Sequence, residues 1–111
     1  MSGGAHDSQL VRGPISKDLL GACLICLGWR IDFANEGTLV AELSTKDSPP
    51  QEFSTSVTWQ AQVNFVQVSV EVICKTEIER SQSACEAQLK RLISNIKQKF
   101  GEVDPPKRRE T

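Results

Sequence analysis

The chain has 111 residues, a length that predicts a single domain. Its 13 basic and 14 acidic residues give a net charge of -1, which argues against sequence-specific nucleic-acid binding, because proteins with that function are usually strongly basic. With 39% hydrophobic and 24% charged residues, the composition excludes a wholly disordered chain and a membrane-embedded one. One histidine and no tyrosine leave few groups for acid–base catalysis near neutral pH.

The N-terminal segment shows no apolar periodicity, so we expect a flexible tail over residues 1–13. A helix is predicted to follow, from Lys17 to about Leu27. Ser16 is a favourable N-cap residue because its hydroxyl can accept a hydrogen bond from an unpaired amide of the first turn. Gly28 suits the position after the helix end, where a left-handed backbone is common.

The apolar run from Leu19 to Trp29 has to be distinguished from a membrane or export segment. It is about half the length that a bilayer-spanning helix needs. An export signal would require an apolar core where the charged residues Lys17 and Asp18 stand. We therefore predict no membrane span and a cytoplasmic protein whose cysteines are reduced.

Two strands joined as a hairpin are predicted next. Apolar and polar residues alternate over 29–33 and again over 38–43, which is the period of a strand with one buried face. Residues 34–37 contain asparagine and glycine, which adopt the positive φ angles that tight turns need. The following segment, 44–54, contains prolines and charges and predicts an exposed loop.

Residues 55–76 alternate more strongly, but the buried phase changes near Asn64. A strand cannot change its buried face without a turn or a bulge. We therefore predict two antiparallel strands, 55–62 and 66–76, with one long bent strand as the alternative. Trp59 is expected on the face that the helices cover, because its apolar neighbours at alternate positions share its phase.

Helical spacing of apolar residues marks the last element, which ends at Phe100. Ser83 and Glu86 fit the S-x-x-E pattern of a capping box, in which each side chain accepts a hydrogen bond from the other residue's amide. Gly101 suits the position after the helix. Residues 102–111 are rich in charge and proline, and we expect a flexible tail there.

Together these elements predict an α+β fold for a single domain over residues 14–101. The expected order is helix, four strands and helix. Short connections favour a four-stranded antiparallel sheet, and the N-terminal and C-terminal helices can then pack on one of its faces, giving two layers.

The cysteines raise the question of metal or redox chemistry. Cys23 and Cys26 form a C-x-x-C inside an apolar helix, and no second close pair supplies further zinc ligands. We therefore expect these two and Cys74 to be buried core residues, with no metal or other cofactor. Cys85 lies just after the predicted helix cap, where amides stabilise a thiolate, and it is the candidate for an alternative thiol redox function.

The favoured interpretation of function is a small, non-catalytic protein-interaction or adaptor module. No nucleophile has a neighbouring histidine in the sequence, and no glycine-rich phosphate loop is present. The first helix is apolar nearly all round, which is more surface than one sheet face can cover. We expect this excess to bind a protein partner or a second copy of the chain through Leu20, Leu24 and Ile25.

A second interpretation is a phosphate- or anionic-lipid-binding module that uses the basic C-terminal helix. No acidic residue lies between positions 87 and 101. The candidate anion-binding residues in this stretch are Lys90, Arg91, Lys97 and Lys99. Binding of this kind would weaken steeply with ionic strength, which distinguishes it from an apolar interface.

Overall fold

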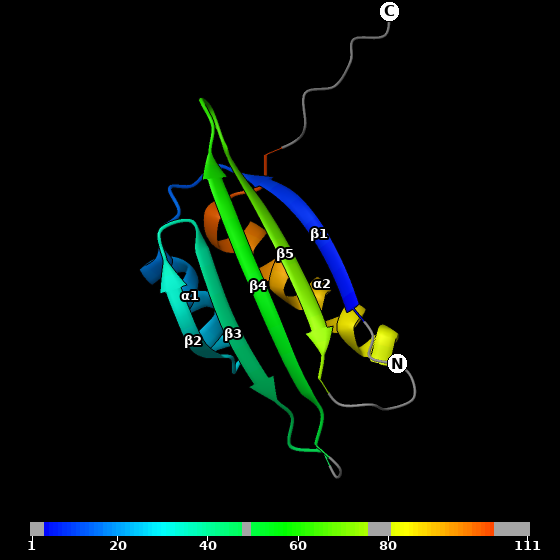
Figure 1. Ribbon diagram of the computed structural model, residues 1–111. Helices are drawn as coiled ribbons and strands as arrows, with labels where there is room; N and C mark the ends of the chain where they lie inside the picture. The colour runs from blue at the N-terminus through cyan, green and yellow to red at the C-terminus, as the bar shows by residue number, and fades with distance from the viewer. Residues whose placement is uncertain (1–3, 48–49, 76–80, 104–111) are drawn as a thin grey trace, which may run out of the picture.

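A five-stranded antiparallel sheet with two helices on one face forms the part of the chain that the computed structural model describes, residues 4–47, 50–75 and 81–103 (Figure 1). None of its helices is long and apolar enough to cross a membrane. In chain order the elements are β1 (Gly4–Val11), α1 (Lys17–Cys26), β2 (Arg30–Asn35), β3 (Thr38–Ser44), β4 (Glu52–Ala61), β5 (Val66–Cys74) and α2 (Ser81–Phe100).

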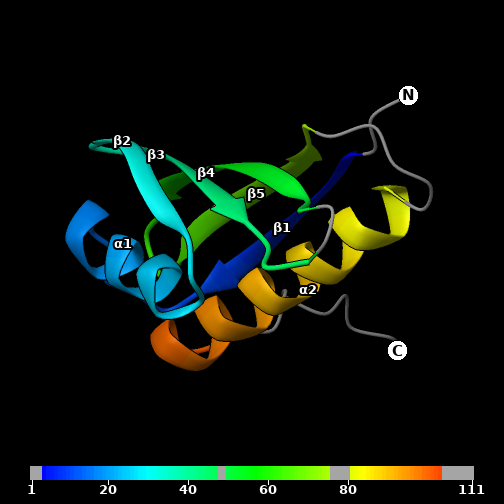
Figure 2. The same cartoon turned by 90° about the horizontal axis from the view of Figure 1, so that it is seen from below.

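The spatial order of the strands is β1-β5-β4-β3-β2, so β1 and β2 are the two edges of the sheet. Both helices lie beneath the same face, with α1 under β2 and β3 and α2 under β1 and β5 (Figure 2). The helices also contact each other. The α+β class and the antiparallel sheet are therefore as predicted, whereas the element order begins with a strand.

The prediction of four strands is wrong by one, because residues 4–11 form β1 and not part of a tail. All eight residues of β1 pair with β5, from Gly4 opposite Ile73 to Val11 opposite Val66. Few residues of β1 are apolar, so periodicity does not mark it as a strand. Its stability comes from a hydrogen-bonded ladder with a strand more than fifty residues away in the chain.

Part of the predicted C-terminal tail also belongs to the sheet edge. Glu102 forms an antiparallel bridge with Val11, and the Val103 amide donates to the Leu10 carbonyl at 3.0 Å. The remainder of that prediction, residues 104–111, lies outside the described residues.

The predicted hairpin between β4 and β5 is confirmed, and the single bent strand is not found. The turn is closed by the Gln62 amide, which donates to the Phe65 carbonyl at 2.7 Å. The phase change in the sequence is therefore the turn itself (Figure 1). β4 begins at Glu52, three residues earlier than predicted, so the loop before it is shorter.

The hydrophobic core lies between the sheet and the helices. Every second residue of β5 from Val66 to Cys74 is buried, in the predicted phase. Thr55 is the one buried polar side chain among the described residues, and its hydroxyl donates to the Glu71 carbonyl at 2.8 Å. The largest fully buried side chains include Leu20, Leu24, Leu39, Phe53, Val57, Val68, Val70, Leu92 and Ile96.

A β-bulge in β2 overturns the predicted phase of that strand. The pairing with β3 shifts between Ile31, opposite Ala41, and Phe33, opposite Val40. Phe33 therefore lies on the sheet face without helices, because cross-strand partners share a face. Trp59 keeps the predicted helix-covered phase but is only partly buried, near the end of β4.

Of the two predicted helix starts, only that of α1 is confirmed. The Leu19 amide donates to Ser16 Oγ at 3.2 Å, which confirms Ser16 as the N-cap of α1. The predicted capping box at Ser83 and Glu86 is wrong, because α2 already begins at Ser81.

We expect Phe53→Ala and Phe33→Ala to differ strongly in stability, although both remove the same side chain. Phe53 is 1% exposed, so its removal should cost about 3–5 kcal/mol, as for other buried aromatic residues. Phe33 is 52% exposed, and its removal should cost at most about 1 kcal/mol. Urea denaturation followed by circular dichroism measures both values. Equal costs would contradict the bulge in β2.

Candidate functional site

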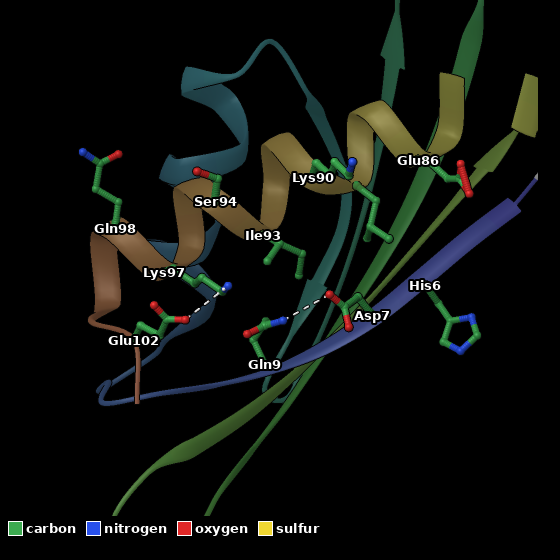
Figure 3. A pocket seen from close by; sticks show the side chains of 11 residues that line it. His6, Asp7, Gln9, Glu86, Lys90, Ile93, Ser94, Lys97, Gln98 and Glu102 are labelled. Carbon is green, nitrogen blue, oxygen red and sulfur yellow. Dashed lines mark hydrogen bonds and ion pairs between the residues drawn. The ribbon is translucent and has the colours of Figure 1, made fainter. Parts of the chain in front are cut away.

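A groove of about 900 Å³ lies between β1 and α2 on the described surface (Figure 3). Its walls come from an edge strand on one side and from the longer helix on the other. The lining residues are His6, Asp7, Gln9, Glu86, Leu89, Lys90, Ile93, Ser94, Lys97, Gln98 and Glu102.

Strand and helix periodicity position these side chains. Asp7 and Gln9 pair with the buried residues Val70 and Val68, so they point to the helix-covered side of the sheet. On α2, Leu89 and Ile93 are nearly buried and form the apolar floor of the groove. Charged and polar residues one helical turn apart form its rim.

Several polar groups in the groove already have partners. The carboxylate of Asp7 accepts hydrogen bonds from the Ser8 amide at 2.8 Å and from Gln9 Nε2 at 3.1 Å. Lys97 Nζ lies 3.3 Å from Glu102 Oε1 (Figure 3). Glu86 and Lys90 form no ion pair with any residue of the described ranges. The lysine at position 90 is thus the cation that the groove offers to another molecule.

The structure does not bring the four predicted anion-binding residues together. Lys90 and Lys97 line the groove, and the charge of Lys97 is balanced by Glu102. Lys99 lines a different hollow, between α1 and α2. Arg91 is exposed and does not line the groove. Lys90 and Lys97 are seven residues apart and share one face of α2, whereas Arg91 and Lys99 lie at other angular positions.

Two of the three predicted partner-binding residues belong to the core of the chain itself. Leu20 and Leu24 are 0% exposed, so the prediction that they contact a partner is corrected: they pack inside the core of the chain. α1 packs against β2, β3 and α2, and these contacts cover more of the helix than one sheet face would, although Leu19 stays 43% exposed. Ile25 is 60% exposed, and a contact of Ile25 with a partner or a second copy stays a prediction.

The burial of the cysteines differs in part from the prediction. Cys23 and Cys74 are buried as expected, but Cys26 is exposed. Cys85 is fully buried, and this burial raises the pKa of its thiol, with Cys74 and Glu86 adding to the effect. Burial also raises the pKa of the Cys23 thiol, although the charge of Lys99 partly opposes it.

The expected thiolate at Cys85 is therefore wrong. The residue lies in the second turn of the longer helix, inside the core, and not at a solvated helix end. None of the four cysteines forms a disulfide, and within the described ranges no cluster of three or more metal-ligating side chains is found.

The wall of the groove that β1 forms was not predicted from the sequence. His6, Asp7 and Gln9 fall in the segment predicted as a tail, so nothing related them to the basic helix. Periodicity gives no signal for this strand, because Asp7 and Gln9 occupy two of its inward positions.

Comparison with known proteins does not identify the chain. No protein-family model matches it, and no curated protein matches its sequence. The interpretation of the groove therefore rests on its geometry and chemistry.

We expect Leu24→Glu to unfold the protein and Ile25→Glu to leave it folded. A charge at the 0% exposed position 24 would lose the leucine packing and bury an unpaired carboxylate, at a cost of about 4 kcal/mol or more. The change at the 60% exposed position 25 should cost within about 0.5 kcal/mol. Thermal denaturation measures both. Sedimentation equilibrium of wild type and Ile25→Glu then tests self-association through α1.

We expect Cys26 to react first with a thiol reagent under native conditions. Cys23 and Cys85 should react far more slowly, because burial limits access and their raised pKa values lower the thiolate fraction. Mass spectrometry of peptides after timed alkylation identifies the order. Fast modification of Cys85 in the folded protein would contradict its placement in the core.

Proposed function

We propose that this chain is a small, non-catalytic protein-interaction module that binds a segment of a partner protein in the groove between β1 and α2. The observation that carries the proposal is the position of the groove, which lies between an edge strand and a helix. Such a position offers main-chain hydrogen bonds on one wall and side-chain contacts on the other. The absence of disulfides among the four cysteines is consistent with the cytoplasmic setting that we propose for this interaction.

The lining of the groove suits a peptide better than a small anion. Its floor is apolar, from Leu89 and Ile93, and its rim carries both signs of charge. Glu86 and Lys90 stand one turn apart without ion-pair partners among the described residues. An incoming segment can therefore place a basic group near Glu86 and an acidic group near Lys90.

The anion-binding alternative has less support. A phosphate or lipid headgroup is best held by several cations that converge on one point. Here the two lysines of the groove share it with Asp7, Glu86 and Glu102, and Lys99 belongs to another hollow. Ionic strength separates the two functions, because binding through an apolar floor weakens much less with added salt than binding through several cations.

Selection from a phage-displayed library of random short peptides tests the proposal. We expect synthetic versions of the enriched peptides to bind the wild type with a Kd below about 100 µM. Ser94→Trp, which places a large ring on the rim of the groove, should weaken binding by at least about tenfold. Lys90→Glu should weaken binding to peptides that carry an acidic residue by about fivefold or more.

Arg91→Glu is the matched control, because it makes the same charge change at the neighbouring position outside the groove. Its affinity should stay within about twofold of the wild type. The proposal fails if no peptide is enriched, or if Arg91→Glu weakens binding as much as Lys90→Glu. Fluorescence polarisation at low and high salt measures all these affinities.

A further inference from the structure

We infer that the outer edge of β1 accepts an extended segment of the partner protein as a sixth strand of the sheet. This inference rests on the proposed function and specifies how the groove would be occupied. Strand addition to a sheet edge is a recurring mode of peptide recognition, in which main-chain hydrogen bonds supply affinity and alternate side chains supply specificity.

The two edges of the sheet are not equivalent. β2 carries a bulge between Ile31 and Phe33. Its edge also carries the charges of Arg30 and Asp32, whose side chains lie 3.6 Å apart. Bulges and charges are the usual protection of an edge strand against further pairing. β1 pairs with β5 in one uninterrupted register over its whole length, without a bulge, a proline or a lysine.

The main-chain groups of β1 that point away from β5 belong to its even-numbered residues. The Gly4 amide donates to Gln82 Oε1 at 3.1 Å, which places it outside the ladder with β5. The Leu10 carbonyl accepts from Val103. Because N–H and C=O groups alternate in direction along an antiparallel strand, His6 and Ser8 face outward as well.

These outward groups are occupied at both ends of β1 and open in the middle. Gln82 occupies one end, and residues 101–103 occupy the other. Between them, the Ser8 amide is taken by the Asp7 carboxylate. Within the described chain no hydrogen-bond partner is found for the amide and carbonyl of His6 or for the Ser8 carbonyl. One donor and two acceptors are thus presented along about 10 Å of the edge, from His6 to Ser8.

Side chains of an added strand would alternate between the two faces of the sheet. Those on the helix-covered side would enter the groove over Leu89 and Ile93, so an apolar residue is favoured there. An acidic residue two positions away can reach Lys90. The occupant that matches both the edge and the groove is therefore an extended peptide with an apolar and an acidic residue on one face.

A second copy of the chain is a poorer match for the same edge. β1 and α2 run side by side in the same direction, since Gly4 contacts Gln82 and Val11 pairs with Glu102. The middle of the open edge therefore lies beside Lys90, which lines the groove with His6 and Asp7. A two-fold axis there would bring two Lys90 side chains together, which like-charge repulsion opposes.

His6→Pro and His6→Ala test this inference with the tightest synthetic peptide from the library selection. Proline removes the outward amide of His6 and is tolerated on an edge strand at a position whose N–H does not enter the ladder. We expect His6→Pro to lose at least about tenfold in affinity and His6→Ala to stay within about threefold. Thermal denaturation establishes that both variants are folded.

A scan of the same peptide by single N-methylation provides a second measurement that needs no variant of the protein. Methylation should abolish binding at positions two residues apart, whose amides donate to the carbonyls of His6 and Ser8, and should be tolerated between them. A loss with no period of two would overturn strand addition.

The outcomes separate the two proposals. If Ser94→Trp weakens binding but His6→Pro equals His6→Ala, the groove binds peptides and the strand-addition inference is wrong. If no groove-dependent peptide is found, the proposed function fails and the inference fails with it. If sedimentation equilibrium shows a dimer that His6→Pro dissociates, the occupant of the β1 edge is a second copy of the chain and the peptide proposal is wrong.

Discussion

Pairing between β1 and β5 connects the first residues of the chain to its middle, and the candidate site depends on this ladder. It places Val11 in the core, sets Asp7 and Gln9 beside α2, and turns the main-chain groups of His6 outward. The same strand then provides a partner for residues 101–103, which follow α2. Without β1, the edge of the sheet would be β5 and the groove would lose one wall.

Packing of α1 in a corner explains how a helix apolar on most sides is accommodated. The sheet covers one side of it and α2 covers another, so Leu20 and Leu24 are buried without any partner. The prediction of surplus apolar surface assumed that only the sheet covers α1, whereas α2 covers part of it as well. The groove beside β1, with its apolar floor and charged rim, is therefore a better candidate for recognition than the apolar helix.

The sequence located one wall of that groove and missed the other. Lys90 and Lys97 were identified from the charge pattern of the C-terminal helix, because helical periodicity and charge are local properties. His6, Asp7 and Gln9 were not, because the strand that carries them has few apolar residues and is stabilised by distant pairing. The capping pattern at Ser83 was local as well, but it was overridden by a helix that begins earlier.

By itself, the sequence determined the α+β class, the β4–β5 hairpin, the Ser16 cap of α1 and the alternating burial of β5. These features follow from hydrogen bonding and hydrophobic periodicity among residues close together in the chain. Only the tertiary structure decided the fifth strand, the bulge that exposes Phe33 and the burial of Cys85. Each of these depends on contacts between segments far apart in the chain, which no local pattern specifies.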